Sequence, residues 1–314
     1  MKKRILTAVG IVVTLILFFV LKVFVNDYFF DALIFGMGAF AAYEAAKILS
    51  KAGVKNYQYL CLSFVAVQFI SNFLGIFYKL PVWLIIVIDI ASIIVVAFGS
   101  FLWSLISKKT KDEIRVKEVK ISKAKFSFNR ALGNLICFIY PTFFVMLMML
   151  LNHFDGLALI NIDNYNGKLS LIVLLFMFLI PIFTDTFAML IGMLIGGKKL
   201  CPKISPKKTI SGAVGGTLCC VLLSVSVYYI LYSTNYFYTV LAQGLPIWAF
   251  IIIILLGSII AQTGDLFESF LKRRAGVKDS GKILPGHGGM LDRIDSYIFV
   301  APFLLIAFAL VVVL

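Results

Sequence analysis

The sequence predicts an all-α polytopic integral membrane protein with about nine transmembrane helices. Hydrophobic residues make up 61% of the 314-residue chain and its mean hydropathy is +1.03, whereas soluble domains contain about 45–50% apolar residues. Apolar runs of about 20 residues, the length of one helical span, recur along the chain. These runs are too long and too continuous for the strands of a β-barrel, which have about 10 residues of alternating pattern.

The expected spans account for most of the chain. The first is expected to stay in the protein, because it exceeds the apolar region of a signal peptide, about 7–15 residues, and lacks a small-x-small cleavage motif. The runs at 80–106 and 169–197 are long enough to be tilted or broken. In chain order the spans are 5–25, 29–49, 57–78, 80–106, 131–151, 169–197, 212–233, 239–262 and 297–314.

The basic residues predict how these spans are oriented. With the N-terminus in the cytoplasm, every Lys and Arg except Lys22, Lys79 and Lys168 falls on the cytoplasmic side, in agreement with the positive-inside rule. We therefore expect a multi-pass protein of the cell membrane with its C-terminus outside. The net charge of +14 reflects this topology and an attraction to anionic lipid headgroups, so membrane lipids and no nucleic acid are the expected partners.

A basic cytoplasmic connector at 107–130 divides the chain into two parts. Residues 1–106 are expected to be scaffold helices, and residues 131–314 are expected to form the catalytic membrane domain. Within the connector, the alternating sequence IRVKEVKIS at 114–122 is typical of a short strand or an interfacial segment. The five cysteines show no metal-binding spacing, and His153 lies in an outer loop where no role is expected.

A polar island at 265–295 separates the last two apolar runs. Asp292 and Asp295 are three residues apart, so in a helix their carboxylates lie on one face. Asp265 ends the preceding span, and a chain that doubles back can bring it to the same place. Carboxylates with no cysteine and a single histidine suit Mg²⁺, which prefers oxygen ligands. We predict that these three aspartates form a metal site.

A glycine-rich turn at 285–289 precedes the last two aspartates. Its glycines allow backbone N–H groups to approach phosphate oxygens closely. His287, between them, can donate a hydrogen bond to a phosphate or orient a ligand.

A second polar constellation lies upstream of the island. Asp185 stands inside an apolar run, about three turns from its cytoplasmic end, and therefore needs a polar cavity. The sequence Ser-Pro-Lys-Lys-Thr at 205–209 offers hydroxyls, two ammonium groups and a helix N-terminus, all suited to phosphate. We expect Asp185 and this segment to complete the site that the island begins.

Three other acids are expected to be structural. Glu44 lies near the cytoplasmic end of its helix, where it is expected either to snorkel to the membrane surface or to pair with Lys47 or Lys51 on the same face. Asp89 is deeper and is expected to face the bundle interior or a cavity. Glu268 is expected to form ion pairs with the basic residues one turn later.

The two polar segments together resemble one family. The pattern S-x-L-K-R-x₄-K-D-x-G-x₂-L-P-x-H-G-G-M-x-D-R-I-D at 269–295 resembles the full signature of the phosphatidate cytidylyltransferases, the CDP-diacylglycerol synthases. The upstream D-T-x-A and P-K-I-S-P-K-K-T-x-x-G stretches are similar to that family's other recognisable segment. The resemblance covers about 181–296. The family often has glycine where Phe187 stands and an acid where Ser211 stands, so no carboxylate role is carried over to position 211.

The resemblance implies cytidylyl transfer from CTP to phosphatidate, giving CDP-diacylglycerol and pyrophosphate, in a site that faces the cytoplasm. It also implies a homodimer, and Mg²⁺ as cofactor, alone or with a second cation that is either divalent or monovalent. The implied metal ligands are Asp265, Asp292 and Asp295. The implied catalytic residues are Asp265, Asp292, Asp295, Asp185, Lys272, Arg273 and His287. The implied substrate-binding residues are Ser205, Lys207, Lys208, Thr209, Ser269, Lys278, Asp279, Gly288, Gly289 and Arg293.

Two other functions are compatible with parts of the sequence. A sibling enzyme would transfer the cytidylyl group to an ether-linked or polyprenyl lipid phosphate. A transporter or ion channel would explain Glu44, Asp89 and Asp185 but has no need of the aspartates and glycines of the island. Transporters more often carry charges near the midplane of repeated halves, and the sequence has no such repeat.

Overall fold

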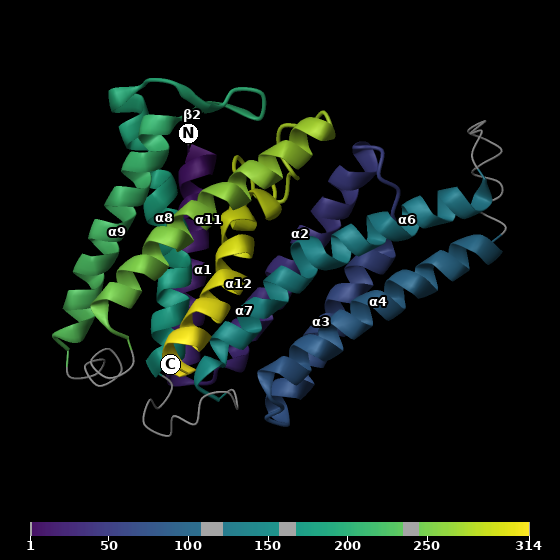
Figure 1. Cartoon of the computed structure of the whole chain (residues 1–314), viewed down its shortest axis with the longest axis horizontal. Coiled ribbons are helices and arrows are strands. Elements are labelled where there is room, and N and C mark those ends of the chain that lie inside the picture. Colours follow the sequence, from purple (N-terminus) through teal and green to yellow (C-terminus); the bar gives the residue numbers. More distant parts are fainter. Residues whose placement is uncertain (1, 108–121, 157–167, 235–244, 314) are drawn as a thin grey trace.

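The structure is a computed structural model that describes residues 2–107, 122–156, 168–234 and 245–313. Eight helical stretches within these residues are long and apolar enough to cross a membrane. The remaining expected span, the first in the chain, corresponds to α1 (Lys2–Phe24). Its apolar part, Val9–Phe24, is shorter than the other eight stretches. The described residues hold one small two-stranded sheet, so the predicted all-α membrane architecture is confirmed (Figure 1).

The helix boundaries follow the apolar runs, because a run of apolar residues forms a helix wherever lipid or other helices surround it. The first part of the chain forms α1, α2 (Tyr28–Lys51), α3 (Gln58–Phe77) and α4 (Val82–Ile106). The second part forms α6 (Lys123–Cys137), the π-helical η1 (Phe138–Phe143), α7 (Phe144–Asn152), the short η2 (Phe154–Gly156), α8 (Lys168–Ile195), α9 (Ile210–Tyr232), α11 (Ile247–Arg274) and α12 (Leu291–Val313).

The span after the connector starts earlier than predicted. Residues Lys123–Arg130, assigned to the connector, form the first turns of α6, and the Ser122 side chain caps this helix by accepting from the Lys125 N–H. The helix is interrupted at Pro141, which has no N–H to donate, and Tyr140 leaves helical conformation with φ −118° and ψ 118°. Most of the predicted strand at 114–122 lies outside the described residues.

The last two spans extend into the polar island. α11 continues to Arg274 and α12 begins at Leu291, whereas the apolar runs end at 262 and begin at 297. Polar residues therefore occupy regular helix on both sides of a shorter segment, the island loop (residues 275–290). Three basic residues in the last turn of α11 favour its C-terminal end electrostatically.

The segment between α8 and α9 forms a hairpin that was not predicted. Strand β1 (Lys199–Cys201) pairs antiparallel with β2 (Ser205–Thr209). The Thr209 side chain caps the next helix by accepting from the Gly212 N–H at 3.1 Å.

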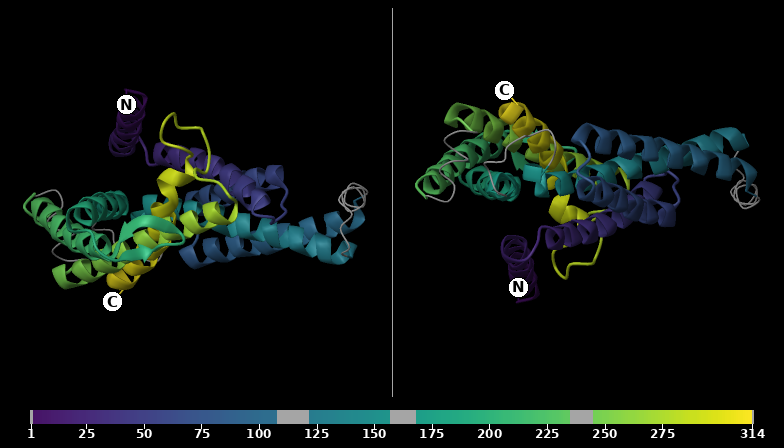
Figure 2. Two further views of the ribbon diagram at one scale, coloured as in Figure 1. Left: turned by 90° about the horizontal axis from the view of Figure 1, so that it is seen from above. Right: turned by 90° about the horizontal axis from the view of Figure 1, so that it is seen from below.

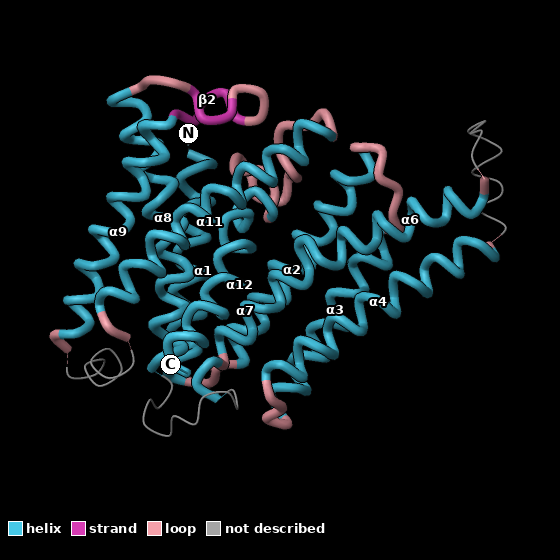
Figure 3. The backbone as a smooth tube through the Cα atoms, in the orientation of Figure 1, coloured by secondary structure: helices cyan, strands magenta, loops and turns pink. Residues whose placement is uncertain are grey.

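One end of the helix bundle carries the polar segments. The N-terminus, the β-hairpin and the island loop lie at the top in Figure 1, and the C-terminus lies at the bottom. Figure 3 shows that the hairpin lies beyond the ends of α8 and α9. The view from above in Figure 2 shows the island loop beside α1 and α2. These are segments that the basic residues assign to the cytoplasmic side, and the orientation itself stays a prediction.

The core is built around α7 in the second part of the chain. Every residue from Val145 to Asn152 is buried, and the same hydrophobic cluster joins α2, α8, α11 and α12 through large side chains such as Phe30, Phe176 and Phe250. α3 and α4 contribute less to this core and expose apolar side chains such as Trp83 and Ile94, as expected of helices that face lipid.

Glycines allow α8 and α9 to approach each other very closely. A Cβ added at Gly216 would lie 2.7 Å from the Thr184 carbonyl oxygen, and a Cβ at Gly212 would collide with the Ala188 carbonyl oxygen. Backbone contact of this kind is how small residues pack membrane helices. It fixes α8, which carries Asp185, against the helix that follows the hairpin.

The expectation for Asp89 is confirmed. Its side chain is fully buried between α4 and α3, where the Asn72 side-chain N–H donates to Oδ2 at 2.7 Å. Gln68 donates to the Asp89 carbonyl at 3.2 Å. The carboxylate therefore has a structural partner within the scaffold.

His153 has a contact that the sequence did not predict. Its Nε2 lies 2.8 Å from Asp31 Oδ2. Asn152 donates to the other oxygen of Asp31 at 2.8 Å, and Lys22 pairs with Asp27 at 2.5 Å. This buried polar network ties α1, α2 and α7 together at the end of the bundle opposite the island loop.

Candidate active site

A cavity of about 780 Å³ lies between α8, the hairpin, α9, α11 and α12. Five acidic and five basic side chains line it, so both cations and phosphates find partners there. The charged lining residues are Asp185, Asp265, Asp279, Asp292, Asp295, Lys199, Lys207, Lys208, Lys272 and Arg293. The structure thus brings Asp185 and the 205–209 segment to the aspartates of the island, as predicted.

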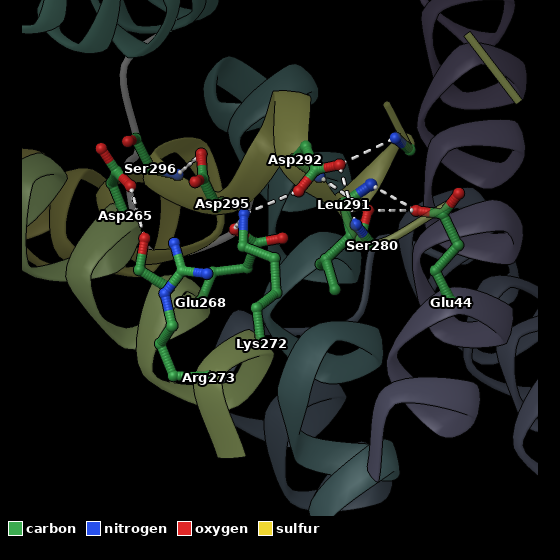
Figure 4. Close-up of polar contacts among 12 residues, drawn as sticks. Glu44, Asp265, Glu268, Lys272, Arg273, Ser280, Leu291, Asp292, Asp295 and Ser296 are labelled. Carbon is green, nitrogen blue, oxygen red and sulfur yellow. Dashed lines mark hydrogen bonds and ion pairs between the residues drawn. The ribbon is translucent and has the colours of Figure 1, made fainter. Parts of the chain in front are cut away.

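Asp292 is held at the start of α12 by three donors. Its Oδ2 accepts the backbone N–H groups of Ser280 at 2.9 Å and Gly289 at 2.8 Å, and its Oδ1 lies 2.7 Å from the Lys272 ammonium (Figure 4). Gly288 has φ +88°, and a Cβ there would collide with Asp292 Oδ2. The glycine turn thus brings one backbone N–H group, that of Gly289, to a carboxylate.

Lys272 joins the two sides of the island. It forms an ion pair with Glu268 one turn earlier on α11 and another with Asp292 on α12. Glu268 is fully buried, so its negative charge depends on this lysine. The predicted structural ion pair of Glu268 is confirmed.

Asp265 connects α11 to the hairpin. Its Oδ2 lies 2.5 Å from the Lys208 ammonium on β2, and its Oδ1 is 3.4 Å from the Ser269 hydroxyl. Arg273 on the same helix donates from Nε to the Ile204 carbonyl in the hairpin turn at 3.2 Å. The hairpin is therefore attached to α11 by an ion pair and a hydrogen bond.

Asp295 and Asp185 complete the acidic side of the cavity. The Ser296 N–H donates to Asp295 Oδ1 at 2.8 Å, and Asp295, Asp265 and Asp185 line the same cavity. Gly264 permits this arrangement, because a Cβ there would lie 2.7 Å from the Asp295 carbonyl oxygen. Figure 4 shows Asp265 and Asp295 on neighbouring helices.

Some predicted site residues lie beside this cavity rather than in it. Lys278, His287 and Gly288 line a neighbouring cavity of about 710 Å³, which shares Asp279 and Arg293 with the first. Ser205, Ser269, Arg273 and Gly289 do not line the main cavity. Ser269 and Gly289 contact the lining residues Asp265 and Asp292, and Arg273 contacts the hairpin turn.

The prediction for Glu44 was wrong. Its carboxylate is 2% exposed and accepts the Ser280 hydroxyl and the Leu291 N–H, each at 2.9 Å, rather than pairing with a lysine of its own helix. Lys47 lies over the Tyr43 ring instead, at 5.9 Å from its centroid. A scaffold helix thus contacts the island directly. The depth of Glu44 in an apolar run was the available signal, but it named no partner.

One further residue of the site, Gln262, was not singled out from the sequence. Gln262 lines the cavity and donates to the Thr217 hydroxyl at 2.9 Å. Ser211 donates to the Gly196 carbonyl and thereby links the hairpin end of α8 to α9. Phe187, the other departure from the family pattern, is half-buried and does not line the cavity.

The donor set suits the predicted Mg²⁺ in type, because the cavity offers carboxylate oxygens. As the described side chains stand, no group of three acidic, histidine or cysteine residues is close enough to hold one ion. The ammonium groups of Lys208 and Lys272 lie against Asp265 and Asp292. The magnesium site therefore stays a prediction.

Comparison with known proteins gives a consistent result. A sequence model described as "Cytidylyltransferase family" matches residues 2–311. The chain is 45% identical over 132 residues to a protein of Staphylococcus haemolyticus named phosphatidate cytidylyltransferase, and 47% identical over 131 residues to one of Staphylococcus saprophyticus with the same name. Each match covers 42% of this chain and 46% of the relative, so the chain spans just under half the length of these relatives.

Proposed function

This chain belongs to the cytidylyltransferase family, and on that premise we propose that it transfers a cytidylyl group from CTP to phosphatidate, giving CDP-diacylglycerol and pyrophosphate. The observation that carries the proposal is the cavity with its mixed charge. Both substrates bear phosphates, which need basic partners, and the acidic side chains beside them supply sites for the counter-cations that polyphosphates bring.

The α8 wall of the cavity supports a lipid substrate. Ala188, Met189 and Met193 line it, and Met189 and Met193 are 59% and 67% exposed. Apolar side chains exposed at membrane depth contact lipid tails. A phosphate on a lipid beside α8 can therefore reach the charged residues while its tails stay in the bilayer.

The reaction needs no nucleophile from the protein. An oxygen of the lipid phosphate attacks the α-phosphorus of CTP, and the bond to the β-phosphate oxygen breaks, so pyrophosphate leaves. Lys207, Lys208, Lys272 and Arg293 neutralise the phosphates, and Arg293 has the geometry for bidentate contact. The chain's contribution is to hold two anionic reactants together in one place.

Asp265, Asp292 and Asp295 would hold Mg²⁺, alone or with a monovalent second cation, and Asp185 lines the same cavity as a further ligand or as a partner of one. When bound, the ion would stabilise the charge on the attacking and leaving oxygens.

The proposal places the enzyme in the cell membrane with the cavity open to the cytoplasm. The basic residues near the cavity end of the bundle support this orientation, and CTP is available on that side. A homodimer remains part of the proposal through the family resemblance.

The test is an assay of purified protein with radiolabelled CTP, Mg²⁺ and phosphatidate. We expect metal-dependent formation of CDP-diacylglycerol with one pyrophosphate per turnover. Absence of both products in a folded preparation would overturn the proposal. Competition between phosphatidate, an ether-linked phosphatidate and a polyprenyl phosphate identifies the lipid acceptor, and solute flux in proteoliposomes without turnover would indicate transport instead.

Replacing Lys208 by alanine is expected to raise the KM for CTP about 10- to 100-fold, because a charge-assisted contact to phosphate contributes roughly 1.5–3 kcal/mol. Lys208 lies at the cavity on β2, against Asp265. Lys203, in the turn of the same hairpin, is exposed and does not line the cavity, so Lys203→Ala is the matched control. Equal KM values for the two variants would show that Lys208 does not bind CTP.

A further inference from the structure

Glu44 is a buried acid whose contacts all lead to the island. Its Oε2 accepts hydrogen bonds from the Ser280 hydroxyl and the Leu291 N–H, each at 2.9 Å (Figure 4). Among the described residues no ion pair is formed by this carboxylate, although it is 2% exposed. A buried carboxylate without a cationic partner is costly, so its hydrogen bonds must compensate for the lost hydration.

The island leaves space for this carboxylate. A Cβ added at Gly281 would collide with Glu44 Oε1, and a Cβ added at Gly289 would collide with both Glu44 carboxylate oxygens. Gly281 and Gly289, both in the island loop, thus lie against the same side chain from α2. Alanine at either place would expel the carboxylate from its position between Ser280 and the start of α12.

Two hydrogen bonds connect Glu44 to Asp292. Ser280 donates its hydroxyl to Glu44, and the same hydroxyl oxygen accepts the Asp292 N–H at 3.3 Å. The Ser280 N–H donates to Asp292 Oδ2 at 2.9 Å. Ser280 therefore contacts both the backbone and the side chain of Asp292, and Glu44 sets the position of Ser280.

The hydrogen bond between Glu44 and the Leu291 N–H also affects the position of Asp292. Leu291 is the first residue of α12, and its N–H is one of the donors that a helix N-terminus leaves without an intrahelical partner. Glu44 accepts that N–H and thereby fixes where α12 begins. Asp292 is the next residue, so the orientation of its side chain toward Lys272 follows from this boundary.

We propose that Glu44 is a positioning residue of the active site, which acts through Ser280 and Leu291 to aim Asp292 at the cavity. The inference rests on the proposed function for the role of Asp292. The contact between Glu44 and the island loop does not depend on it. The residue belongs to α2, in the part of the chain predicted to be scaffold, and it makes that part necessary for catalysis.

Glu44→Gln and Glu44→Met form a matched pair, because the side chains have the same length and only glutamine retains an acceptor oxygen. Glutamine can keep both hydrogen bonds, in a weaker form without the charge. We expect kcat to fall about 100-fold in Glu44→Met, as for a displaced reacting group, and less than about tenfold in Glu44→Gln. The KM for CTP should change less than about threefold in both.

Two controls separate positioning from general loosening. Thr7 on α1 donates to the Pro285 carbonyl at 2.9 Å, so Thr7→Val removes a different contact to the island loop that does not lead to Asp292. Asp89→Asn changes another buried acid of the scaffold that has no contact with the island. Both variants should keep kcat within about threefold of the wild type.

Limited trypsin digestion measures the same contact without reference to the substrate. Lys278 and Lys282 are exposed in the island loop, and fragment masses identify cleavage after them. Glu44→Met should be cut there faster than the wild type, and Asp89→Asn should not. If the wild type makes no CDP-lipid, the proposed function fails, while the cleavage rates still decide whether Glu44 holds the loop.

A double variant provides the decisive comparison. Ser280→Ala breaks the same connection, so adding Glu44→Met to it should lower kcat little further than the larger single loss. Losses in kcat that multiply in the double variant would overturn the proposal. It would also be overturned by wild-type kcat in Glu44→Met, or by losses of equal size in Thr7→Val or Asp89→Asn.

Discussion

Asp292→Asn is expected to lower kcat about 100- to 1000-fold, the range seen when one preorganised polar contact is removed from an active site. The reason is the number of donors around the carboxylate. Two oxygens accept Lys272 on one side and the N–H groups of Ser280 and Gly289 on the other. An asparagine has one acceptor oxygen, so its NH₂ group must face either the ammonium or the two backbone donors.

Asp155→Asn is the matched control for this substitution. Asp155 also accepts two backbone N–H groups, from Leu169 at 3.2 Å and Ser170 at 2.7 Å, but it does not line the cavity. It should therefore show a comparable change in thermal stability and near-normal turnover. CDP-lipid formation and the unfolding temperature in detergent are measured for both variants. Turnover of Asp292→Asn above about a third of wild type would contradict the assigned role.

Lys272→Met is expected to lower the free energy of unfolding by about 3–5 kcal/mol, the cost of removing one partner from a buried ion pair. Lys272 is 13% exposed at its side chain, and the side chains of its two partners, Glu268 and Asp292, are 0% and 7% exposed. Methionine keeps the length of the chain but leaves both carboxylates without their cation. Turnover should also be lost, because Lys272 lines the cavity.

A second substitution separates these two effects. Glu268→Gln removes the deeper of the two charges, so the double variant Lys272→Met with Glu268→Gln should recover much of the stability while staying inactive. Thermal unfolding of the purified protein in detergent measures the stability, and the CTP assay measures the turnover. If the losses in the free energy of unfolding from the two substitutions simply add in the double variant, the Glu268 carboxylate is not stabilised by Lys272.

The sequence predicted the spans and the grouping of Asp265, Asp292 and Asp295 on one cavity, because both depend on residues close together in the chain. Apolar runs form membrane helices almost wherever they occur. The continuation of α11 to Arg274 was missed, since side chains that face a polar cavity end the apolar run before the helix ends. Hydropathy describes the polarity of side chains, so it cannot show where the helical backbone ends.

Other features required the fold. The contact between Glu44 and Ser280 joins residues 236 positions apart, and the nearest polar neighbours of Glu44 in the sequence suggested a different partner. The β-hairpin was missed because Ser-Pro-Lys-Lys-Thr has the composition of a turn, and pairing with β1 gives it extended structure. The basic residues were assigned to phosphates, yet Lys208 and Lys272 also neutralise carboxylates of the protein itself.

The glycine contact between α8 and α9 limits which residues the chain can carry at position 216. A side chain at Gly216 would press on the backbone of Thr184, whose neighbour is Asp185 on the cavity. A larger residue at this packing contact would therefore shift Asp185 relative to the other side chains of the cavity. A glycine in a packed membrane helix, without chemistry of its own, therefore helps to determine where a charged residue of the cavity lies.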